Sequence, residues 1–218
     1  MDQVREKPWL AHYDPGVPPE IQVPDIPLWR FLEESARRFP QNVALEFLGK
    51  TLSYQELWGL ARRFAQGLKD LGVRPGDRVA IMLPNSPQFV IAFYGTLLAG
   101  GVGVNVNPLY TPRELRHQLA DAGAETLVIL DHLLPRYLEV EKEVPVKRVV
   151  VTGIKDFLPF PKNLLYPLKA KRDGLPLGFP KREGFHAFAE LLKRPPAEPH
   201  VPDPEDRALL QYTGGTTG

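Results

Sequence analysis

An uncharged stretch from Val79 to Tyr110 limits the possible folds of this chain more than any other feature of its sequence. Prolines, glycines and asparagines interrupt the stretch, so its apolar pieces are too short to cross a bilayer as one helix. The pattern instead predicts a buried strand, a helix and a second buried strand. Strands that are apolar on both faces are typical of a parallel sheet covered by helices on each side.

Strands and helices also alternate further along the chain. Residue pairs that form capping boxes, Ser53 with Glu56 and Thr111 with Glu114, predict the starts of two helices. Connections that contain a helix join parallel strands by right-handed crossovers. We therefore predict an α/β fold with a parallel, doubly wound sheet and flanking helices. The expected strands span residues 78–83, 102–106, 126–131 and 146–152.

We divide the chain into five segments on these patterns and on composition. The hairpin expected at 43–52 and the strand expected at 207–213 are assigned to neighbouring sheets, and a helix is expected over 185–192. Because a glycine loop after a strand normally opens a helix, we expect the sequence to be truncated at its last loop. The segments are an extended N-terminal arm (1–26), a helix, hairpin and helix of a neighbouring βα subdomain (27–76), a parallel βα subdomain (77–154), a basic, aromatic and proline-rich excursion with a linker (155–206), and a strand with the truncated loop (207–218).

Charge and composition exclude several classes of function. The chain has 27 basic and 26 acidic residues, so no overall field draws it to nucleic acid. It has no cysteine, which excludes disulfides, thiolate metal sites and cysteine nucleophiles. The five histidines are scattered without the spacing of ligands, so we predict no metal site. The N-terminus leads into no apolar run that would serve as a secretory signal, and we expect a cytoplasmic protein.

The glycine-rich loop is the sharpest candidate for a binding site. Glycines after a strand let backbone N–H groups turn inward around phosphate oxygens. Threonine hydroxyls can donate to the same oxygens or bind the accompanying Mg²⁺. The alternative is a polar tail without a ligand. The candidate cofactor-binding residues are Thr213, Gly214, Gly215, Thr216, Thr217 and Gly218.

Three motifs in order along the chain resemble the core motifs of adenylate-forming enzymes. The first is Leu52-Ser53-Tyr54-Gln55-Glu56-Leu57, the second combines 97–101 with 104–110, and the third is 211–218. The sequences of the second and third motifs are most similar to those of long-chain fatty acid–CoA ligases. The resemblance runs from about Lys7 to Gly218. Without the resemblance, the residue pattern of the first motif predicts the start of a helix, and that of the second predicts core and turn structure.

The resemblance implies the N-terminal part of a large domain and a two-step reaction. A fatty acid carboxylate attacks the α-phosphorus of ATP, and coenzyme A then displaces AMP from the acyl-adenylate. Residues 213–218 would hold the β- and γ-phosphates, with Mg²⁺ as their counter-ion. The loop lysine, the adenine and ribose contacts, the magnesium carboxylate and the adenylation lysine of the family all fall beyond Gly218. No catalytic or metal-binding residue is therefore assigned to this chain, and the chain alone is expected to be inactive.

Two alternatives stay open. The first keeps adenylation chemistry but changes the acid to an aryl, amino or short-chain one, because the pocket residues that decide this lie mostly downstream. The second is a non-catalytic, truncated interaction module whose exposed N-terminal arm pairs two copies of the chain into a homodimer.

The segment 155–182 is explained by none of the motifs. It has seven basic residues against two acidic ones, together with several aromatic residues and leucines. Its five prolines predict a loop with short turns rather than one long helix. The segment is either a surface excursion packed by its own aromatics or a peripheral membrane contact at the inner face of the membrane.

Overall fold

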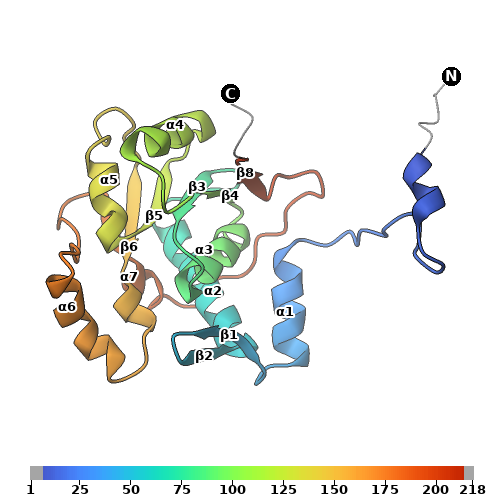
Figure 1. Ribbon diagram of the computed structural model, residues 1–218, viewed down its shortest axis with the longest axis horizontal. Coiled ribbons are helices and arrows are strands. Elements are labelled where there is room, and N and C mark those ends of the chain that lie inside the picture. The colour runs from blue at the N-terminus through green and yellow to red at the C-terminus, as the bar shows by residue number, and fades with distance from the viewer. Residues whose placement is uncertain (1–6, 214–218) are drawn as a thin grey trace.

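The computed structural model describes residues 7–213 and has a six-stranded parallel sheet at its centre (Figure 1). The strand order is β7-β6-β5-β3-β4-β8, and every neighbouring pair is parallel. This arrangement confirms the predicted α/β fold and the parallel sheet over residues 78–152. The strands are β3 (Arg78–Met82), β4 (Val102–Asn105), β5 (Thr126–Leu130), β6 (Arg148–Thr152), β7 (Phe185–Ala187) and β8 (Leu209–Gln211).

Helices cover the sheet in two groups. Helix α2 (Tyr54–Asp70) packs against α3 (Pro87–Leu98) and α7 (Phe188–Leu191), whereas α4 (Pro112–Ala122) packs against α5 (Leu134–Leu138). The chain passes from β3 to β4 on one side and then crosses over to β5 on the other. Right-handed crossovers in opposite directions place α3 and α4 on opposite faces, which is the doubly wound arrangement.

The predicted helix starts are present. The Ser53 backbone N–H donates to Glu56 Oε2 at 2.7 Å, and Ser53 Oγ accepts from the Glu56 N–H at 3.2 Å. The same pair of contacts joins Thr111 to Glu114 at the start of α4. The hydrogen bond from the Ser53 N–H holds the pKa of Glu56 below its usual value, since it stabilises the ionised carboxylate. These local contacts fix where α2 and α4 begin.

The core is continuous. Most buried apolar side chains from Trp29 to Ala197 belong to one hydrophobic cluster, and the side chains of 79–82 and 127–129 are completely inaccessible. Helix α1 (Trp29–Arg38) joins this cluster. The segment boundaries drawn at residues 76 and 154 remain a prediction. The hairpin of β1 (Val43–Phe47) and β2 (Lys50–Ser53) forms its own antiparallel sheet, as predicted.

Two expectations about strands were wrong. The strand in 207–213 belongs to the main sheet, because β8 pairs in parallel with β4 at its edge. Residues 185–192 are not one helix: Phe185–Ala187 form β7 at the other edge, and only Phe188–Leu191 are helical. Each of these edge strands is three residues long and is specified by pairing with a strand distant in sequence, which local periodicity cannot reveal.

The segment 155–182 contains a helix where a loop was expected. After a short 3₁₀ turn, η3 (Ile154–Phe157), helix α6 runs over Lys162–Arg172 with Pro167 inside it. Proline removes one helical hydrogen bond, but the carbonyl that it leaves free belongs to Asn163, a partly exposed residue. The expected helix over 133–143 is also shorter, with η2 (Asp131–Leu133) followed by α5.

The N-terminal arm extends away from the rest of the molecule (Figure 1). It contains one 3₁₀ turn, η1 (Pro8–His12), and none of the residues of that turn is buried. Ile21 and Val23 are 87% and 83% exposed, so the arm leaves apolar side chains in solvent. No helix between residues 7 and 213 has the length and apolar character needed to cross a membrane.

Candidate functional site

Of the six candidate loop residues, only Thr213 lies within the part of the chain that the structure describes. It follows β8 and Tyr212 at the carboxyl end of the edge strand, and it is exposed. Gly214, Gly215, Thr216, Thr217 and Gly218 lie outside the described residues. The surroundings of Thr213 therefore define the candidate site.

The second and third motifs meet at this edge. Asn105 at the end of β4 is the register partner of Gln211 at the end of β8. Asn105 Nδ2 donates to Gln211 Oε1 at 3.0 Å, and the Asn105 carbonyl accepts from Gln118 Nε2 of α4 at 2.8 Å. Because the carboxyl ends of parallel strands lie on one edge of the sheet, two motifs that are distant in sequence meet there. Motif spacing alone did not reveal this contact.

Tyr212 attaches the chain before Thr213 to helix α4. Its hydroxyl donates a hydrogen bond to Asp121 Oδ2. Burial, followed by the hydrogen bond to the Asp121 carboxylate, raises the pKa of Tyr212 to about 12. The tyrosine therefore stays protonated at neutral pH and holds the start of the loop against α4.

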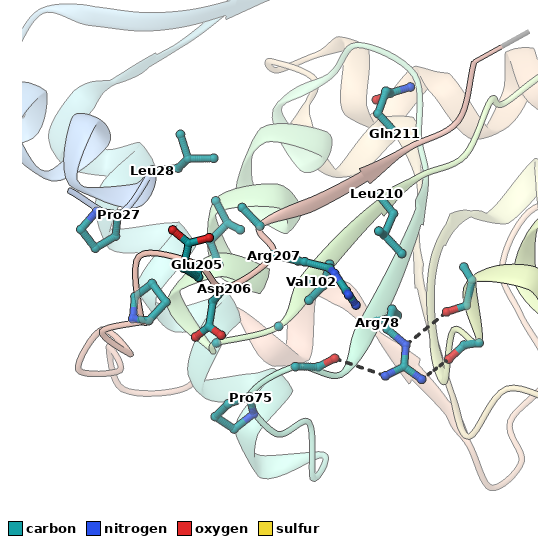
Figure 2. Close-up of a pocket in the computed structure, with 18 of the residues that line it drawn as sticks. Pro27, Leu28, Pro75, Arg78, Val102, Glu205, Asp206, Arg207, Leu210 and Gln211 are labelled. Carbon is teal, nitrogen blue, oxygen red and sulfur yellow. Dashed lines mark hydrogen bonds between the residues drawn. The ribbon is translucent and has the colours of Figure 1, made fainter. Parts of the chain in front are cut away.

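A cavity of about 1140 Å³ runs along β8 and reaches Thr213 (Figure 2). Arg78 lines it, but its guanidinium donates to the carbonyls of Gly76, Ala122 and Gly123 at 3.3, 3.1 and 3.0 Å. That arginine therefore closes a turn and is not free to bind a ligand. Glu205 and Asp206 line another part of the cavity and would repel phosphate there.

The other motif residues belong to the scaffold, as their patterns predicted. In the first motif, Leu52 and Leu57 are buried, and Ser53 with Glu56 forms the helix cap. In the second motif, Val104 and Val106 are buried. The Asn107 side chain accepts from the Leu109 N–H at 2.9 Å, which closes a turn.

The described residues offer no cluster for a metal ion. Between residues 7 and 213, no three histidine, aspartate or glutamate side chains come together in a way that could hold one. Asp121, the carboxylate next to the candidate site, is engaged by Tyr212.

Comparison with known proteins decides the family. The model of the AMP-binding enzyme family matches residues 32–218, which include the whole sheet and all three motifs. The chain belongs to the AMP-binding enzyme family. This confirms the resemblance drawn from the motifs.

The curated relatives that match this chain include several CoA ligases. The chain is 43% identical over 98% of its length to a long-chain-fatty-acid–CoA ligase of Bacillus subtilis (strain 168) and 38% identical to one of Escherichia coli O157:H7. It is 32% identical over 92% of its length to 4-coumarate-CoA ligase 1 of Narcissus pseudonarcissus. The chain covers 39% of each of the two bacterial relatives and 33% of the plant enzyme.

Solved structures of AMP-binding enzymes share the fold. A long-chain-fatty-acid-CoA ligase from Archaeoglobus fulgidus superposes on 92% of this chain, which covers 37% of that one, with a TM-score of 0.72 and 26% identity. An anthranilate CoA ligase in complex with anthranoyl-AMP superposes on 90% of this chain, which covers 34% of that one, with a TM-score of 0.73 and 24% identity. At this identity the second match supports the fold alone.

Proposed function

We propose that this chain is the N-terminal part of an ATP-dependent fatty acid–CoA ligase of the cytoplasm. The overall reaction converts a fatty acid, ATP and coenzyme A to acyl-CoA, AMP and diphosphate through an acyl-adenylate. The observation that carries the proposal is the junction of Asn105 with Gln211, which brings the second and third family motifs to one edge of the sheet.

The chemistry explains why such a protein needs a phosphate-binding loop. A carboxylate has no usable leaving group, so the fatty acid must first be activated by transfer of AMP from ATP. This transfer requires the phosphate charge to be stabilised while the carboxylate is held in line with the α-phosphorus. In the proposal, Thr213, Gly214, Gly215, Thr216, Thr217 and Gly218 hold the β- and γ-phosphates with backbone N–H groups and threonine hydroxyls. Mg²⁺ enters the proposal as the counter-ion of ATP.

The proposed acid is a long-chain fatty acid. The relatives named for that substrate are more similar to this chain than the 4-coumarate ligase is, at 43% against 32% identity. Aryl, amino and short-chain acids are the competing substrates.

A panel of acids tests the proposed substrate. The protein is the product of the longest reading frame that contains this chain, and the measurement is CoA thioester formation with palmitate, 4-coumarate, acetate and an amino acid at saturating ATP. We expect kcat/KM to be highest with palmitate. A preference for 4-coumarate or acetate would refute the fatty acid assignment, and thioester formation without ATP hydrolysis to AMP would refute adenylation.

In such an enzyme, this chain would supply only part of the active site. The chain supplies the phosphate loop and the sheet that supports it, and no catalytic residue is assigned to it. Residues 1–218 alone are therefore proposed to be inactive.

The proposal also includes self-association through the N-terminal arm. Trp9 and Tyr13 in the arm are 53% and 44% exposed, although aromatic side chains of this size usually pack against protein. A second copy of the chain would bury them together with the exposed Ile21 and Val23.

A further inference from the structure

Helix α6 presents its leucines to solvent and not to the core. Leu164, Leu165 and Leu168 are 66%, 57% and 69% exposed, whereas Ala170, on the opposite side of the helix, is buried. Phe160, just before the helix, is 77% exposed. Residues four apart on a helix share a face, so Leu164 and Leu168 form one outward apolar stripe beside Phe160 and Leu165. We call these four residues the α6 patch.

Basic side chains border the α6 patch. Lys169 and Lys171 form no ion pair among the described residues. Two other basic residues have structural partners: Lys162 Nζ donates to the Leu48 carbonyl at 2.8 Å, and Arg172 pairs with Asp173 at 3.3 Å. On the helix itself, Lys169 and Lys171 are therefore available to a partner.

The acidic residues of the segment itself do not offset this charge. Besides Asp173, the segment 155–182 has one acidic residue, Asp156. Its carboxylate accepts hydrogen bonds from the Gly153 N–H at 2.9 Å and from Thr152 Oγ1 at 3.1 Å. That carboxylate is held at the end of β6 and caps η3, so the segment presents apolar and positive side chains on α6.

We propose that the α6 patch docks the protein on the surface of an anionic lipid bilayer. A protein partner that buried the leucines would also have to desolvate unpaired lysines, which is costly. A bilayer with anionic head groups satisfies both features at once: the leucines and Phe160 enter the interface, and the ammonium groups meet phosphate charge. The helix lies in the plane of the interface, because its 11 residues are too few to span a bilayer.

The position of α6 in the molecule suits such a contact. The helix packs mainly against the neighbouring turn η3, and it lies at the outer edge of the structure, remote from β8 (Figure 1). Docking through it would therefore leave Thr213 and the carboxyl end of β8 uncovered. A bilayer contact is thus compatible with nucleotide binding at the other end of the sheet.

Co-sedimentation with vesicles tests the α6 patch. The 218-residue chain is mixed with vesicles of phosphatidylcholine alone or with 30% phosphatidylglycerol, and the partition coefficient is measured. We expect binding to the anionic vesicles only. Reversal of charge in Lys169→Glu/Lys171→Glu should weaken it by about 30-fold or more, at roughly 1 kcal/mol for each basic residue near the surface. Leu164→Ser/Leu168→Ser should weaken it by at least about tenfold, since apolar side chains would no longer enter the interface.

Matched variants separate the patch from general effects. Arg37→Glu/Arg113→Glu makes the same change of net charge at exposed positions on α1 and α4, and Leu109→Ser/Val201→Ser removes apolar side chains that are 81% and 72% exposed. Both controls should bind as the unchanged chain does, and circular dichroism should show all variants folded. Raising NaCl from 0.1 to 0.5 M should weaken the binding of the unchanged chain to anionic vesicles more than that of the Lys169→Glu/Lys171→Glu variant. Absence of binding, equal binding to neutral vesicles, or equal binding of the patch variants and the unchanged chain would overturn the proposal.

Discussion

Two glycines in helix α2 should respond in opposite directions to the same substitution. Gly59 and Gly67 are both inside the helix, and an alanine at either position would gain helix propensity of about 1 kcal/mol. A Cβ added at Gly59 would meet no atom within 4 Å. A Cβ added at Gly67 would lie 2.5 Å from Leu191 Cβ and Cγ and 2.9 Å from Leu191 Cα of helix α7.

The size of the effect follows from what blocks the new methyl group. Leu191 is 4% exposed, and its Cα belongs to the backbone, so α7 itself would have to shift away from α2. Overpacking of this kind costs about 1–3 kcal/mol, and a displaced backbone places the cost at the upper end. After the gain in helix propensity, we expect Gly67→Ala to lower the free energy of unfolding by about 2 kcal/mol. Gly59→Ala should raise it by about 1 kcal/mol.

Urea denaturation followed by circular dichroism at 222 nm measures both variants against the unchanged chain. Equal slopes with different midpoints would show that stability alone has changed. A Gly67→Ala variant as stable as Gly59→Ala would contradict the close approach of α2 to α7. A destabilised Gly59→Ala would contradict the open surface at that position.

Three further predictions concern a titration, a helix cap and the arm. Since the pKa of folded Tyr212 is raised to about 12 above its usual value near 10, the stability gained from its neutral hydroxyl should be fully present below about pH 10 and lost as the pH rises to 12. Unfolding by urea across this range should show that loss in the unchanged chain but not in Tyr212→Phe, and a parallel pH dependence of the two would refute it. Ser53→Ala should lower the free energy of unfolding by about 1 kcal/mol through loss of the α2 cap, whereas Thr51→Val, exposed on β2, should change it little; equal effects in urea denaturation would contradict the capping role. Deletion of residues 1–26 should convert a dimer to a monomer in analytical ultracentrifugation. If the shortened chain still sediments with twice the mass of one chain, the arm is not the dimer contact.

The parts of the fold that depend on neighbouring residues could be predicted from the sequence. Local residue patterns predicted the capping boxes at Ser53 and Thr111 and the apolar strands β3 to β6. Each of these was found where it was expected. Strand β8 was placed in the wrong sheet because its position depends on pairing with β4, about a hundred residues earlier. The three residues of β7 were taken for a helix because only the edge of β6 makes them a strand. At the candidate site, the loop sequence was evident, but its support by Asn105 and Asp121 became visible only when distant elements came together.

The helix α6 shows the opposite limitation. The five prolines of segment 155–182 were read as a barrier to a long helix, but two precede α6, two follow it, and Pro167 inside it frees a carbonyl on a partly exposed residue. The unfavourable effect of a proline inside a helix is smaller at the surface, where water can take the place of the lost hydrogen bond.

Exchange of labelled pyrophosphate into ATP tests the central claim, that this chain carries the phosphate loop of a fatty acid-activating enzyme. Residues 1–218 are assayed alone and joined to the remaining part of the Bacillus subtilis relative, which is 43% identical to the chain over the matched region. We predict exchange that depends on added palmitate in the joined protein and none in the chain alone. Thr213→Val in the joined protein should lower the exchange rate by about 10- to 100-fold, as expected for loss of a hydrogen bond to a charged group, while Thr51→Val should leave it unchanged. Exchange by residues 1–218 alone, or an unchanged rate in Thr213→Val, would contradict the account.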